Sequence, residues 1–134
     1  MEPGMYPRVG VGGVILHDSK VLLLLRKSPP EAGFWSLPGG RVELMELVED
    51  ALVRELKEEL GVEVEIESLL CVTNHIVPAD TAHWVSPAYR VRIVSGTPRN
   101  LEPKKTSAIE WFPLSQLPEN LGLAAKSALA LISR

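Results

Sequence analysis

The segment from Gly39 to Val62 constrains the fold of this 134-residue chain more than any other. A Pro-Gly-Gly turn leads into a stretch where apolar residues recur at Val48, Leu52 and Leu56, the spacing of a helix with one buried stripe. Gly61 is well placed as the left-handed residue that ends such a helix. We therefore predict a helix that starts at residue 46 or 47 and ends at residue 60.

Three glutamates share one side of this predicted helix. Glu55, Glu58 and Glu59 fall within an arc of about 100°. Carboxylates this close repel one another unless a cation lies among them, and hard divalent cations, Mg²⁺ above all, prefer such oxygen ligands. A metal held in this way usually serves phosphate chemistry. Taken alone, the glutamates would also suit a solvated helix surface with Arg54 and Lys57 as partners.

The same segment resembles the signature of the Nudix hydrolases at every constrained position. That signature reads Gly, five residues, Glu, seven residues, Arg-Glu, an aliphatic residue, any residue, Glu-Glu, any residue, Gly and an aliphatic residue. The matching positions are Gly40, Glu46, Arg54, Glu55, Leu56, Glu58, Glu59, Gly61 and Val62. Such agreement would arise by chance in about one window in 10⁹, so the complete pattern favours a metal site over a solvated surface.

The resemblance implies an α/β fold, a Nudix-type α/β/α sandwich with a mixed sheet between helices. We expect residues 1–134 to form a single domain that contains the motif at 40–62. The implied activity is Mg²⁺-dependent cleavage of a phosphoanhydride bond in a nucleoside diphosphate linked to another group X, with Mn²⁺ as a substitute cofactor. Residues 6–26 and 35–40 look like the branch described as MutT-like or ADP-ribose pyrophosphatase-like.

The resemblance also assigns roles within the motif. Glu55 and Glu59 would be the main metal ligands, Glu58 would share that duty, and Gly39 would contribute a backbone carbonyl. Glu55, Glu58 and Arg54 form the expected catalytic group, in which Arg54 pairs with a motif glutamate and orients it. The base would be Glu55 or an acid from a later loop.

Two departures from the family pattern affect these expectations. Residues 45–47 read Met-Glu-Leu where many relatives have a helix-capping Thr or Ser, so the entry to the helix is less well capped. Residues 102–105 read Glu-Pro-Lys-Lys where some relatives have Glu-Pro-Glu-Lys. Lys104 cannot bind Mg²⁺, so either Glu102 or Glu110 takes over, or fewer metals bind.

Candidate substrate contacts outside the helix are Arg26, Trp35 and Glu102. Arg26 ends an apolar strand, and its guanidinium group would suit phosphate oxygens, although an exposed strand end explains it equally well. Trp35 could stack on a nucleobase, whereas packing against the core is the commoner role of such a residue.

Composition limits the classes of partner. A net charge of −3 offers no general attraction to nucleic acid or to anionic membranes, and the longest aliphatic run, Val21 to Leu25, is too short to span a bilayer. One cysteine and no evident signal peptide lead us to expect a cytoplasmic location. We expect a small nucleotide as substrate and a homodimer as one option. A nucleotide sensor without turnover and a hydrolase of RNA 5′ ends are the alternative functions.

The remaining pattern predicts strands before and after the helix. The expected strands cover residues 8–17, 20–27, 62–66, 69–77, 84–94 and 109–112, and a C-terminal helix is expected at 121–133. Pro87 should place the first half of its strand at an edge or a bulge, because proline lacks the N–H group of a sheet ladder.

Overall fold

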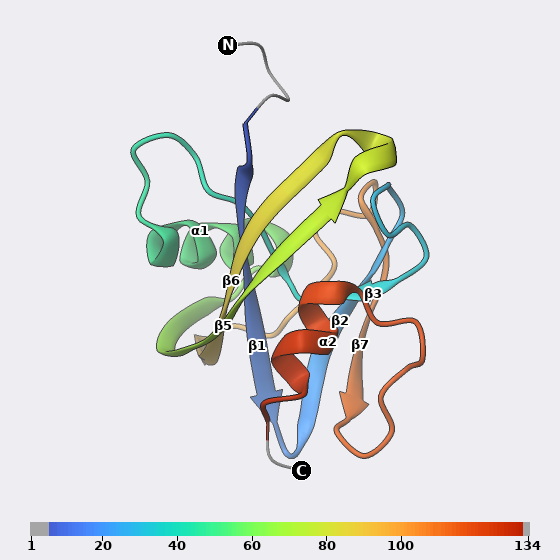
Figure 1. The fold of residues 1–134 in the computed structure, drawn as a ribbon. Coiled ribbons are helices and arrows are strands. Elements are labelled where there is room, and N and C mark those ends of the chain that lie inside the picture. The colour runs from blue at the N-terminus through green and yellow to red at the C-terminus, as the bar shows by residue number, and fades with distance from the viewer. Residues whose placement is uncertain (1–5, 133–134) are drawn as a thin grey trace.

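The computed structural model describes residues 6–132, and in that range a seven-stranded sheet has one helix against each face (Figure 1). The elements are β1 (Arg8–His17), β2 (Lys20–Arg26), β3 (Trp35–Ser36), β4 (Gly39–Arg41), α1 (Val48–Leu60), β5 (Glu63–Val77), a 3₁₀ turn (Pro78–Asp80), β6 (Ala82–Ser95), β7 (Thr106–Pro113) and α2 (Leu123–Leu129). The strand order is β3-β2-β1-β6-β5, with β4 beside β1 and β7 beside β2. The β1–β6 pair is parallel and the other pairs are antiparallel, so the predicted mixed-sheet α/β/α sandwich is confirmed.

Alternation along the central strands creates two cores, one under each helix. Side chains of β1 and β2 point in turn to opposite faces, as strand geometry requires. The α1 face buries Val11, Ile15, Leu22, Leu24, Leu52 and Leu56 among others. The α2 face buries Val14, Val21, Leu23, Leu37, Ala125 and Leu129 among others. Both helices therefore pack on the same sheet, and the near-continuous apolar run of β2 serves both cores.

The first helix matches its prediction closely. It begins at Val48, and Leu47 at the N-cap position makes no side-chain capping bond, as the missing Ser or Thr implied. Gly61 adopts φ 74° and its N–H donates to the carbonyl of Lys57, so it is the expected left-handed terminator. Four buried residues, Ala51, Leu52, Leu56 and Leu60, form the stripe that faces the sheet.

Predictions for several elements after α1 were wrong, and β7 begins three residues before the expected strand at 109–112. The expected strands at 62–66 and 69–77 are one strand, β5, because bulges rather than a turn absorb the irregular residues between them. Pro87 lies in the interior strand β6, opposite Val72 of β5. Val85 and Ala88 pair with residues of β1, but Pro87 between them does not. The ladder between β1 and β6 therefore skips the residue that lacks an N–H group. The helix expected at 121–133 is shorter, at 123–129; residues 133–134 lie outside the described part.

None of the helices in residues 6–132 has the length and apolar character needed to cross a membrane.

Candidate active site

Two glycines of β4 bring backbone directly against the glutamate helix. β4 pairs with β1 so that Gly40 lies opposite Val11 and Gly39 opposite Gly12. A Cβ atom on Gly40 would stand 2.2 Å from Cδ of Glu55, and one on Gly39 would stand 2.0 Å from the carbonyl oxygen of Val11. Neither position has room for a side chain, which explains the Gly-Gly pair physically.

Glu59 turns its carboxyl group toward the same β4 backbone. The N–H of Gly39 donates to Oε1 of Glu59 over 3.0 Å. The residue as a whole is partly exposed, but protein atoms surround its carboxyl group, and this burial raises its pKa from 4.5 to about 8. The Gly39 bond opposes that rise, whereas the negative charges of Glu102 and Glu55 add to it. The site therefore holds a carboxyl group that is costly to ionise unless a cation is near.

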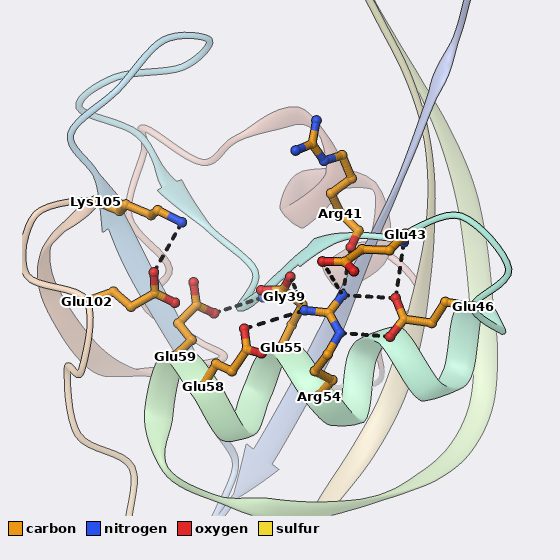
Figure 2. Close-up of polar contacts among 10 residues, drawn as sticks. All are labelled: Gly39, Arg41, Glu43, Glu46, Arg54, Glu55, Glu58, Glu59, Glu102 and Lys105. Carbon is orange, nitrogen blue, oxygen red and sulfur yellow. Dashed lines mark hydrogen bonds and ion pairs between the residues drawn. The ribbon is translucent and has the colours of Figure 1, made fainter.

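Arg54 ties the entry loop to the helix through a two-pronged ion pair (Figure 2). Its Nε donates to Oε2 of Glu46 over 2.7 Å and its Nη2 to Oε1 over 2.9 Å. The guanidinium group lowers the pKa of Glu46 to about 2, and Glu46 in turn raises the pKa of Arg54. Glu46 also accepts from the N–H of Glu43, which closes the turn before α1.

The same arginine engages two of the three helix glutamates. Its Nη1 donates to Oε1 of Glu55 over 2.9 Å and to Oε2 of Glu58 over 3.4 Å. The Glu55 side chain is only 17% exposed, and its burial raises its pKa, with Arg54 pulling in the other direction. The Glu58 side chain is 56% exposed. Arg54 thus contacts both Glu55 and Glu58, and the positioning role that the resemblance implies for it stays a prediction.

The loop before β7 places a fourth carboxylate next to Glu59. The N–H groups of Arg99 and Leu101 donate to the carbonyls of the last two residues of α1, each over 3.0 Å, so the loop satisfies the helix C-terminus. Glu102 follows directly, and Figure 2 shows its side chain beside Glu59. Its Oε2 lies 3.2 Å from Nζ of Lys105. Of the two acids left open by the sequence, the structure brings Glu102 to the helix.

Contacts with neighbouring residues explain the positions of two other candidate side chains, Arg26 and Trp35. Arg26 donates from Nε to the carbonyl of Pro30 over 2.9 Å, so it braces the loop after β2. Trp35 packs edge-on against Phe112, with ring centroids 4.8 Å apart, and joins the core on the α2 face. A substrate role for either residue stays a prediction, and these contacts do not direct either side chain at the glutamates.

As they stand, no three His, Cys, Asp or Glu side chains in residues 6–132 converge closely enough to hold an ion. The reason is visible in the contacts: Arg54 attracts Glu55 and Glu58, while the Gly39 N–H attracts Glu59. The donor set nevertheless has the chemistry of a hard-cation site, with carboxylates on one helix face and a buried member whose pKa is raised. These groups lie in one region of the molecule, because α1 and β4 adjoin.

Comparisons with known proteins agree with this arrangement. The family model of the NUDIX domain matches residues 6–132. An ADP-ribose pyrophosphatase of Methanocaldococcus jannaschii is 37% identical over 86% of this chain and 67% of its own length. A human 8-oxo-dGDP phosphatase is 32% identical over 81% of this chain and 33% of its own length. The crystal structure of a MutT NUDIX hydrolase from Burkholderia pseudomallei superposes with a TM-score of 0.91 and 47% identity, covering 96% of this chain and 99% of that one.

The family match and the relatives named as pyrophosphatases and phosphatases identify a hydrolase of acid anhydrides that contain phosphorus. The chain belongs to the Nudix family, because the family model spans nearly all of it. Members of this family generally use divalent metal ions and act on small nucleotides.

Proposed function

We propose that this Nudix hydrolase uses Mg²⁺ to cleave a phosphoanhydride bond in a nucleoside diphosphate linked to another group X. The observation that carries the proposal is the placement of the Glu55 and Glu59 carboxyl groups against the Gly39–Gly40 backbone. The negative charge of these carboxylates would repel a polyphosphate, so a cation is needed for such a substrate to approach the site.

Four groups would hold the ion: the carboxylates of Glu55, Glu58 and Glu59, and the carbonyl of Gly39. When bound, a divalent ion neutralises phosphate charge and lowers the pKa of a water molecule. The raised pKa of Glu59 supports this assignment, because a buried carboxylate is stabilised far more by a nearby cation than by solvent. Mn²⁺ would substitute for Mg²⁺, since both favour carboxylate oxygen.

Two carboxylates are candidates for the proton acceptor. Glu55 is held by Arg54 in one orientation, and its burial raises its pKa, which favours uptake of a proton. Glu102 lies beside Glu59 on a loop attached to the end of α1. Glu102 is not one of the four proposed ligands, so Glu102→Gln separates the two candidates. If Glu102 is the base, this change lowers kcat without weakening Mn²⁺ binding, and if Glu55 is the base, it leaves kcat nearly unchanged.

A substrate screen tests the proposal. The panel contains nucleoside triphosphates, 8-oxo-dGTP, ADP-ribose, nucleotide sugars, dinucleotides and a short 5′-triphosphorylated RNA, each with Mg²⁺ and with EDTA. We expect Mg²⁺-dependent turnover of at least one free nucleotide and its loss in Glu59→Gln. Glu65→Gln, which alters an exposed carboxylate of β5, is the matched control and should keep full activity.

The screen also distinguishes the alternatives. Nucleotide binding without turnover across the panel would favour the sensor, and preference for the RNA over free nucleotides would favour the RNA-end hydrolase. The net charge of −3 gives the second alternative no electrostatic support.

A further inference from the structure

The outermost strand, β5, is protected against further strand pairing along only part of its length. Among residues 6–132, β5 pairs with β6 alone, so its other edge presents backbone groups free to pair. Proteins usually guard such an edge with charged side chains or bulges. The first half of β5 has both kinds of protection. It contains Glu63, Glu65 and Glu67, and all three register shifts of the β5–β6 pair fall before Cys71 or at it.

The second half of β5 has neither protection. We call residues 71–77 and their β6 partners, residues 82–88, the distal ribbon. It contains no Asp, Glu, Lys or Arg, and its pairing runs without a shift from Cys71 opposite Ala88 to Val77 opposite Ala82. Figure 1 shows this part of β5 and β6 rising beyond both helices to the 3₁₀ turn.

One face of the distal ribbon also exposes apolar side chains along β5. Val72 is 52% exposed and Ile76 is 58% exposed, and the side chain of Asn74 between them is exposed as well. Thr73, which points to the other face, is buried. Exposed β-branched residues on an uncharged, regular edge form a surface suited to pairing with another strand.

We propose that the distal ribbon is the interface between two copies of this chain, whose β5 strands pair antiparallel, edge to edge. The sequence about Asn74 is what selects a second copy as the occupant. A twofold axis through Asn74, the midpoint of the segment, gives the longest pairing and sets Val72 of each copy opposite Ile76 of the other. That arrangement forms two cross-strand pairs of β-branched residues. No charged side chain in residues 71–77 lies opposite a like charge of the other copy.

Sedimentation velocity over about a hundredfold range of protein concentration tests the interface, because a dimer of modest area dissociates on dilution. We expect a concentration-dependent dimer for the wild type. Val72→Lys sets a charge opposite the apolar Ile76 of the other copy at both ends of the pairing and should weaken the dimer at least about tenfold. The matched control is Val94→Lys, which changes a residue of β6 that is 50% exposed but lies outside the distal ribbon. Circular dichroism verifies the fold of both variants.

Cysteine cross-linking tests the register. In a Cys71→Ser background, Asn74→Cys should form an intermolecular disulfide quickly on mild oxidation, because the symmetry axis brings the two thiols together. Val94→Cys in the same background should not. A wild type that stays monomeric throughout, a Val72→Lys protein that dimerises as tightly as the wild type, or an Asn74→Cys protein that does not cross-link would each overturn the proposal. A partner other than this chain would leave the purified protein monomeric.

Discussion

Replacing Glu59 by glutamine should stabilise the metal-free protein at pH 8, although it should abolish hydrolysis. The folded protein raises the pKa of this carboxyl group from 4.5 to about 8, chiefly by burial. A carboxyl group of this kind favours the folded state most at low pH, where it is protonated in both states. Its contribution to stability is lost as pH rises from about 4.5 through about 8, because only the unfolded chain ionises it freely.

The magnitude follows from the gap between the two pKa values. At about 1.4 kcal/mol per pH unit, the full gap would correspond to about 5 kcal/mol above pH 8. Side-chain rotation toward solvent would relieve part of this, so we expect Glu59→Gln to raise the free energy of unfolding by about 3 kcal/mol at pH 8. At pH 4 the two proteins should differ little. Glutamine has nearly the same shape, and its amide oxygen can still accept the N–H of Gly39.

Urea denaturation in EDTA, at pH 4 and pH 8, measures this difference. Glu58→Gln, on the same turn of α1 with a largely exposed side chain, is the control for removing one negative charge from the cluster. Added Mg²⁺ should stabilise the wild type at pH 8 and have little effect on Glu59→Gln. If Glu59→Gln and the wild type differ equally at both pH values, or if the variant is less stable at pH 8, ionisation of the buried Glu59 does not destabilise the folded protein.

Three further predictions concern the residues that support the site. Gly40→Ala should lower kcat at least about tenfold, because its Cβ would stand 2.2 Å from Cδ of Glu55 and displace that carboxylate; unchanged kcat would show that the contact is not needed. Glu46→Gln should lower Mn²⁺ affinity or kcat by about tenfold, because Arg54 loses the charged partner that fixes it. Titration calorimetry with Mn²⁺ and steady-state kinetics separate the two effects. Leu56→Ala should reduce the free energy of unfolding by about 3 kcal/mol in chemical denaturation, because this fully buried residue anchors α1 to the sheet; a loss below about 1 kcal/mol would contradict its place in the core.

Local sequence patterns predicted the helix well and the strand ends less well. The i, i+4 stripe and Gly61 located α1 to within two residues, because both signals come from the helix itself. The short strands β3 and β4 have no such signal: two or three residues are too few for periodicity, and they are strands only because β2 and β1 lie beside them. The prediction that Pro87 lies at an edge or a bulge was wrong for the same reason. Its tolerance in an interior strand depends on which neighbour needs its N–H, a property of the sheet.

The sequence by itself determined that three carboxylates share one helix face and that a glycine pair precedes them, since both follow from spacing along the chain. Only the tertiary structure decided what those groups meet. The pairing of β4 with β1 presses the glycines against Glu55 and Glu59, and the attachment of the loop at 99–101 to the end of α1 brings in Glu102. Such contacts join residues that are 15 positions apart, as for Gly40 and Glu55, to 42 positions apart, as for Glu59 and Leu101. The resulting burial changes the pKa of a carboxyl group in a way that no local pattern encodes.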